Sequence, residues 1–134
     1  MRKNISTGTA WEPIVGYSRA VVVGNVMEIA GTTASKGSEV LFPGDAAKQA
    51  EYILSLMEKV LNEEGFSLED VVRTRVYLIN IEDWKTVGAV HGQFFGNIRP
   101  ASMMVGVNAF VVPEMLVEIE ATAIRTETKG PMLT

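Results

Sequence analysis

The stretch RPASMMVGVNAFVVPEMLVEIEATAIR, which runs from Arg99 to Arg125, decides the fold of this 134-residue chain. It predicts two β-strands joined by a loop. In its second half, residues of one parity are apolar, whereas the other parity includes Glu118 and Glu120. Because side chains alternate between the two faces of a strand, one face needs a core to cover it and the other carries two carboxylates.

The preceding residues supply elements that can cover the apolar face. The tight-turn sequence Gly24-Asn25 predicts a hairpin. Asp45 is expected to cap a long amphipathic helix that ends at Gly65, and Asn80 is expected to cap a second helix. The predicted elements are an irregular segment at residues 1–13, strands at 20–23, 26–30 and 71–79, a short strand at 40–42, and helices at 46–64 and 81–96.

The order of these elements, β-β-(β)-α-β-α-β-β, predicts a two-layer α+β domain with both helices on one face of the sheet. An uncovered face that mixes charged and apolar residues favours an oligomeric partner, so we expect a subunit interface there. We expect one domain over residues 1–134, with a core at about 14–126 and a mobile tail at 127–134. The uncovered face would carry Arg73, Arg75, Glu118 and Glu120, mixed with Tyr77, Leu116 and Met104.

The composition excludes several classes of protein. The chain has no cysteine, so it has no disulfide, thiolate nucleophile or cysteine-ligated metal. Its single histidine, His91, cannot form a His-pair motif, and we expect no metal site. The net charge of −4 makes nucleic acid an unfavoured partner. The chain lacks an apolar leader and a bilayer-spanning run, so we expect a cytoplasmic protein outside the membrane.

Four motifs together resemble the RidA (YjgF/YER057c-type) family over residues 17–125. They are GYSRA at 16–20, IAGTTA at 29–34, EDVVRTRVYL at 69–78, and RPASMMVGV followed by LVEIEATA in the opening stretch. The resemblance implies a chorismate-mutase-like fold and a homotrimer with small-molecule clefts between its subunits. It also implies a hydrolase without a cofactor, a deaminase that converts reactive 2-imino or 2-enamino acids into 2-oxo acids and ammonia and thereby limits metabolite damage.

The resemblance also implies where the site residues lie. Ser102 occupies the position of the family's arginine, which clamps a substrate carboxylate with two charge-assisted hydrogen bonds that a serine cannot replace. The 2-imino acid activity of the family is therefore doubtful, and Arg19, Arg73, Arg75 and Arg99 remain candidates to replace the clamp. The implied site residues are Glu118 as the catalytic group, and Tyr17, Gly31, Thr32, Ser102 and Met104 as substrate-binding groups.

Some of these residues also admit purely structural roles. Glu118 and Glu120 are either an acid–base pair or the partners of Arg73 and Arg75 in ion pairs. The sequence alone favours ion pairs, and the resemblance moves only Glu118 towards a site role. His91 lies on the apolar stripe of the second helix, so we expect it to be packed and hydrogen-bonded rather than to transfer protons.

Three functions follow, in decreasing order of support. The first is a RidA-like hydrolase that acts on small reactive imines or enamines, with a substrate that differs from the usual 2-imino acids. The second is a trimeric small-molecule binding or regulatory protein whose clefts do not catalyse. The third, taken from older labels of the family, is an endoribonuclease, which the acidic net charge disfavours.

Overall fold

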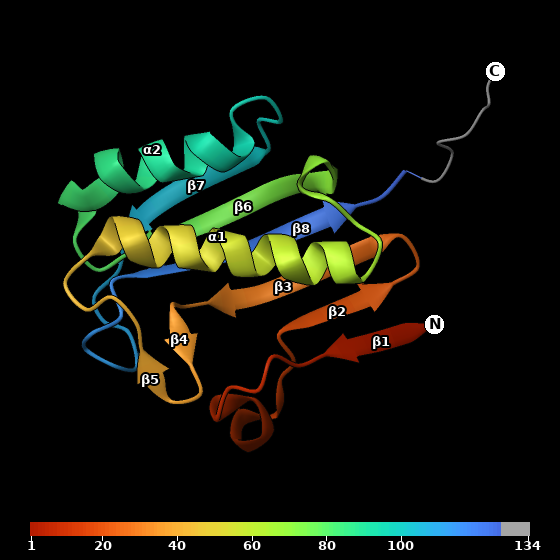
Figure 1. Cartoon of the computed structure of the whole chain (residues 1–134), viewed down its shortest axis with the longest axis horizontal. Coiled ribbons are helices and arrows are strands. Elements are labelled where there is room, and N and C mark those ends of the chain that lie inside the picture. Colours follow the sequence, from red (N-terminus) through yellow and green to blue (C-terminus); the bar gives the residue numbers. More distant parts are fainter. Residues whose placement is uncertain (127–134) are drawn as a thin grey trace.

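In the computed structural model, which describes residues 1–126, one six-stranded sheet carries both α-helices on the same face (Figure 1). The expected tail at 127–134 lies outside the described residues. The strand order is β1-β2-β3-β8-β6-β7. The strands of this sheet are β1 (Arg2–Ile5), β2 (Ala20–Val23), β3 (Val26–Thr32), β6 (Val71–Leu78), β7 (Ala101–Gly106) and β8 (Val117–Ile124). The helices are α1 (Ala46–Glu63) and α2 (Trp84–Phe95), and β4 (Ser35–Lys36) pairs with β5 (Glu39–Val40).

The long-range arrangement confirms the predicted α+β fold. The two strands of the opening stretch, β7 and β8, are not neighbours, because β6 lies between them. Strand β6 runs parallel to β7 and antiparallel to β8, and α2 makes the crossover between the parallel pair. A parallel pair needs such a crossover because a tight turn can join only antiparallel strands.

The predicted ends of α1 and of the hairpin are confirmed by local geometry, whereas Asn80 caps a short 3-10 turn at Ile81–Asp83 and α2 begins only at Trp84. Gly24 has a φ of 59° in the turn between β2 and β3. Asp45 caps α1 by accepting a hydrogen bond from the backbone N–H of Lys48 at 3.0 Å. Gly65 has a φ of 82°, the left-handed conformation expected just beyond a helix C-terminus.

The core lies between the helices and the covered face of the sheet. Val117, Ile119, Ala121 and Ala123 of β8 are at most 2% exposed. They pack with the apolar face of α1, and burial of each large aliphatic side chain stabilises the fold by about 1.5–3 kcal/mol. The intervening residues of β8, which include Glu118 and Glu120, are less buried, as the alternation predicts.

The N-terminal segment departs from the prediction. Residues 1–13 are expected to be irregular, but Arg2–Ile5 forms strand β1 and pairs antiparallel with β2. Arg2, Lys3 and Asn4 are polar and exposed because β1 is an edge strand, and only Ile5 packs against the core. A strand of this kind has no apolar alternation by which a sequence pattern could reveal it.

Two side chains lie on faces that simple alternation does not predict. Val72 is 44% exposed because β6 bulges between Val71 and Arg73, which shifts its pairing with β8. Met104 pairs in register with Val76, so it packs on the core side and not on the uncovered face. The apolar residues of β7 on the uncovered face are instead Met103 and Val105, each 38% exposed.

Neither described helix is both long and apolar enough to cross a bilayer.

Candidate active site

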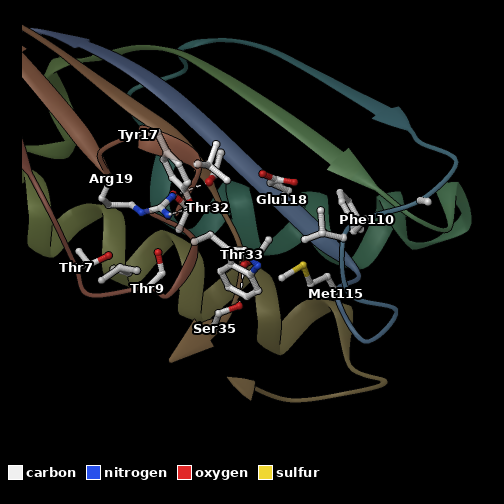
Figure 2. A pocket seen from close by; sticks show the side chains of 16 residues that line it. Thr7, Thr9, Tyr17, Arg19, Thr32, Thr33, Ser35, Phe110, Met115 and Glu118 are labelled. Carbon is white, nitrogen blue, oxygen red and sulfur yellow. Dashed lines mark hydrogen bonds between the residues drawn. The ribbon is translucent and has the colours of Figure 1, made fainter. Parts of the chain in front are cut away.

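A cavity of about 320 Å³ opens where β3 and β8 meet the N-terminal segment and the loop that precedes β8 (Figure 2). A volume of this size is typical of small-molecule sites. The wall combines hydroxyl groups with apolar side chains and very few charges. Its lining includes Thr7, Thr9, Thr32, Thr33 and Ser35, the apolar Trp11, Leu56, Phe110 and Met115, and Tyr17, Arg19, Gly31 and Glu118.

Glu118 lies on the face of β8 that borders this cavity, opposite to the buried residues of the strand. Gly31 leaves room there for the Glu118 carboxylate. The pairing of β3 with β8 shifts between Ile29 and Thr32, which places Gly31 in an irregular part of the ladder. A Cβ on residue 31 would collide with Oε2 of Glu118. Only glycine therefore lets the carboxylate lie against the backbone at this point.

The environment of Glu118 favours its protonated form more than water does. Partial burial raises the pKa of this carboxyl group. The positive charge of Arg19 opposes the shift, the negative charge of Glu120 adds to it, and the net pKa lies above the ordinary glutamate value of 4.5. A carboxyl group with a raised pKa holds a proton more tightly than an ordinary glutamate, which suits a group that accepts a proton and returns it.

Arg19 holds the wall of the cavity together. Its side chain is buried, and its Nη1 donates hydrogen bonds to the carbonyl oxygen of Gly31 at 2.6 Å and to Oγ1 of Thr32 at 3.1 Å. Its Nη2 lies 3.4 Å from the hydroxyl of Tyr17, and the guanidinium lies 5.5 Å from the centre of the Tyr17 ring. The guanidinium thus fixes both the glycine strand and the tyrosine that line the cavity.

A buried carboxylate accompanies this arginine. Oε2 of Glu12 lies 3.8 Å from Nη2 of Arg19, and both side chains are 5% exposed. Glu12 also accepts hydrogen bonds from Thr9 at 2.9 Å and, at longer range, from Thr7. Burial alone would raise the pKa of Glu12, but hydrogen bonds from Ser6, Thr9 and Thr7 outweigh it and lower the pKa. Glu12 is therefore ionised at neutral pH.

The predicted site residues fall into two groups in the single chain. Tyr17, Gly31, Thr32 and Glu118 all line the cavity, although they come from separate parts of the sequence. Ser102 and Met104 do not line it. The hydroxyl of Ser102 instead accepts a hydrogen bond from Oγ1 of Thr74 at 2.8 Å, on the helix-covered face of the sheet.

Of the four candidate arginines, Arg19 is the one at the cavity. Nη1 of Arg75 lies 3.9 Å from Oε1 of Glu120, which also accepts a hydrogen bond from the Tyr77 hydroxyl at 3.3 Å. Glu120 thus has the structural role that the sequence alone favours for the pair of acids. Arg73 and Arg99 are both exposed, and neither lines the cavity.

His91 is packed, as expected. Its Nε2 lies 2.9 Å from Oγ1 of Thr74, and its ring centre lies 4.7 Å from that of Phe95. Burial lowers the pKa of this imidazole, so it is neutral at physiological pH. Within residues 1–126, no group of three or more metal-ligating side chains is close enough together to hold a metal ion.

Sequence analysis missed several residues of the cavity. Thr7 and Thr9 lie in the segment expected to be irregular, as does Glu12, which contacts Arg19 without lining the cavity, and Phe110 and Met115 lie in the loop before β8. Loop residues carry no periodic signal, so their direction depends on tertiary contacts. One signal was available: GYSRA places an arginine two residues after the predicted site tyrosine, just before the predicted strand at 20–23.

Comparison with known proteins gives consistent matches over nearly the whole chain. The family model described as Endoribonuclease L-PSP matches residues 7–125. The human 2-iminobutanoate/2-iminopropanoate deaminase is 34% identical over 135 residues, covering 100% of this chain and 95% of that protein. The 3-aminoacrylate deaminase RutC of Acinetobacter baylyi is 30% identical, covering 83% and 88%. The crystal structure of Rv2704 from Mycobacterium tuberculosis, a member of the YjgF/YER057c/UK114 family, has a TM-score of 0.84 and 45% identity, covering 93% and 100%.

Proposed function

This chain belongs to the YjgF/RidA family, and from that premise we propose that it is a hydrolase, working without a cofactor, that deaminates small reactive imines or enamines. The relatives named as deaminases act on 2-iminobutanoate, 2-iminopropanoate or 3-aminoacrylate. Water adds to the C=N carbon, the C–N bond breaks, and the products are a carbonyl compound and ammonia. No electron is transferred, so the reaction needs no redox partner.

The position of Glu118 is the observation that carries this proposal. Its carboxylate faces a cavity of small-molecule size and forms no ion pair within 4.0 Å with any described residue. Its raised pKa suits a group that takes a proton from the attacking water and returns it to the leaving nitrogen. Tyr17 and the Gly31–Thr32 backbone, held by Arg19, would position the substrate.

We also propose that the working form is a homotrimer in the cytoplasm with ligand clefts between its subunits. The uncovered sheet face carries exposed Met103 and Val105, which supports burial against another copy of the chain. Ser102 and Met104 lie on the helix-covered side of the edge strand β7, so in such a trimer they would reach the cavity of the next subunit along this edge of the sheet and not through the uncovered face. Their substrate-binding role therefore depends on the assembly.

The test is an enzymatic one. Amino-acid oxidase generates 2-iminobutanoate in the cuvette, semicarbazide traps the imine, and the purified protein competes by hydrolysing it. The proposal expects less semicarbazone in the presence of the wild type and no such effect from Glu118→Ala. A Ser102→Arg variant should gain activity on this substrate, because arginine restores a bidentate partner for its carboxylate. If the wild type accelerates the hydrolysis of no imine in a wider panel, the chain is not this hydrolase.

The two alternative functions give different results. A non-catalytic binding protein would show saturable binding of a small molecule in calorimetry without turnover of any imine. Endoribonuclease activity, suggested by the description of the matching family, would appear as cleavage of a labelled RNA that Glu118→Ala abolishes. The net charge of −4 weighs against it, because RNA binding relies on cationic side chains.

A further inference from the structure

The charged groups of the cavity bear on which imines it would accept. Arg19 and Glu118 are the two charged residues among the described residues that line it. A substrate carboxylate binds well where a guanidinium is free to donate two parallel hydrogen bonds to it. Whether this cavity accepts an anion therefore depends on how far Arg19 is already engaged.

The charge of Arg19 is neutralised by Glu12, and its guanidinium already donates hydrogen bonds to other groups of the protein. Glu12, which is ionised, lies 3.8 Å from its Nη2 in a site where both side chains are 5% exposed. The two hydrogen bonds of Nη1 to Gly31 and Thr32 face the protein, and the Nε atom is buried without a partner. The guanidinium cannot turn towards a ligand without breaking these bonds. Its role is to position the cavity wall.

Within the single chain, Glu118 has no ion-pair partner among the described residues, and the charge of Arg19 offsets its charge only in part. Arg75 does not neutralise Glu118, because it is paired with Glu120. In a partly buried site, two like charges repel each other more strongly than in water. A carboxylate on the substrate would be repelled by Glu118, whereas a neutral imine or a protonated, cationic iminium would not be.

The opposite end of the cavity is apolar. Figure 2 shows Phe110 and Met115 on one side of Glu118 and Arg19 on the other. Leu56 and Val111 also line the cavity. A substrate whose C=N group lies beside Glu118 can therefore place a short hydrocarbon chain against this apolar wall.

We propose that this cavity selects imines and enamines that carry an apolar substituent and no carboxylate beside the C=N group. This inference rests on the proposed function and names its substrate class. The reaction is R–CH=NH + H₂O → R–CHO + NH₃, and the class of reaction that supplies the substrate is the two-electron oxidation of a primary aliphatic amine, R–CH₂–NH₂. The aldehyde is the product that a following step must consume.

A matched pair of substrates tests this selection in the full chain. Flavin amine oxidase converts butylamine into butan-1-imine, and amino-acid oxidase converts norvaline into 2-iminopentanoate, which differs from it only by the carboxylate. Semicarbazide trapping measures both rates of hydrolysis. The wild type should have a kcat/KM at least about tenfold higher for butan-1-imine, because only 2-iminopentanoate brings a like charge to Glu118. An equal or higher kcat/KM for 2-iminopentanoate would overturn the inference and leave the proposed function intact.

A stable pair of ligands separates this failure from a failure of the proposed function. If neither of these imines nor any imine of the wider panel is hydrolysed, the proposed function is wrong, and calorimetry with butylammonium and 2-oxopentanoate still tests the charge preference without turnover. Tighter binding of butylammonium would support the preference, and tighter binding of 2-oxopentanoate would refute it.

One variant tests the cause of the selection. Glu12→Gln removes the charge that neutralises Arg19, so the preference should shift towards 2-iminopentanoate by about tenfold in the ratio of kcat/KM values. Glu28→Gln is the matched control, because this exposed glutamate contacts Thr122 outside the cavity and its loss changes the net charge equally. An unchanged ratio in a folded Glu12→Gln protein would refute neutralisation by Glu12. Should this variant fail to fold, the comparison of substrates in the wild type decides the inference alone.

Discussion

At the scale of the residue, the proposed role of Glu118 predicts the pH range in which the enzyme works. Burial raises its pKa, Arg19 opposes the shift and Glu120 adds to it. The carboxylate must be ionised to take a proton from water, so the rate should fall as the pH drops through the raised pKa. The acid limb of a profile of kcat/KM against pH should therefore lie above the ordinary value of 4.5. A rate that stays constant down to that value would contradict the role of Glu118.

The same raised pKa predicts how Glu118 affects stability. Because the folded-state pKa exceeds the unfolded value, the folded chain binds this proton more tightly. The contribution of the group is thus favourable below the unfolded pKa and is lost as the pH rises through the folded pKa. Thermal melts should show Glu118→Gln more stable than the wild type at about pH 8, with a smaller difference near about pH 4. A stability gain of Glu118→Gln over the wild type that increases as the pH falls would contradict this prediction.

Gly31 tests whether the position of the Glu118 carboxylate matters. A Cβ at residue 31 would displace this carboxylate, so Gly31→Ala should lower kcat/KM by about tenfold or more, as small misplacements of catalytic groups do. The control is Gly92→Ala in α2, where no atom would meet the added Cβ. That variant should keep its activity and gain up to about 1 kcal/mol in the free energy of unfolding. Full activity in Gly31→Ala would exclude a precise role for the carboxylate.

Part of the cavity lining could be predicted from the sequence, and the rest could not for a physical reason. Tyr17, Gly31 and Glu118 lie in motifs, so their positions can be carried over from a resemblance. The pair of Glu12 and Arg19 cannot be recognised in this way. Charged residues are rarely buried unless paired, and this pairing depends on the N-terminal segment folding back over β2.

At the scale of the element, one buried side chain connects α1 with the loops around the cavity. Gln49 is 0% exposed. Its Nε2 lies 3.2, 3.2 and 3.0 Å from the carbonyl oxygens of Leu41, Phe42 and Glu114, and its Oε1 accepts a hydrogen bond from the N–H of Leu116 at 2.9 Å. These contacts hold the loop that carries Phe110 and Met115.

Gln49→Leu should therefore destabilise the protein. The change leaves several buried backbone groups without partners, which should lower the free energy of unfolding by about 2–4 kcal/mol in a urea titration. Gln93→Leu, on the exposed side of α2, is the control and should change it by less than about 0.5 kcal/mol. Similar losses in the two variants would show that the buried network does not matter.

The elements differ in how far the sequence predicts them. Helix α1 and the β2–β3 hairpin have caps, turn residues and periodic patterns of their own, so their predicted ends agree closely with the structure. Strand β1 is short, polar and at an edge, so only its pairing with β2 defines it. Local sequence patterns do not predict the position of β6 between β7 and β8 either, because strand order depends on contacts between residues far apart in the sequence.

At the scale of the whole molecule, the open sheet face predicts an assembly. Met103→Asp places a charge on that face and should dissociate a trimer, with sedimentation giving the mass of one chain and imine hydrolysis lost. Trp84→Gln, at an exposed residue of α2, should leave the mass unchanged. Sedimentation of the wild type as a monomer that hydrolyses imines would refute the proposed clefts between subunits.

The most direct test of the central claim compares two glutamates on one strand. Glu118 faces the cavity, whereas Glu120, two residues later, is paired with Arg75 and Tyr77. In the imine assay, Glu118→Gln should lose about a hundredfold or more in kcat/KM, the loss expected for a general base. Glu120→Gln should stay within about threefold of the wild type, since its partners are structural. Equal losses in the two variants, or a larger loss in Glu120→Gln, would contradict the assignment of Glu118 as the catalytic carboxylate.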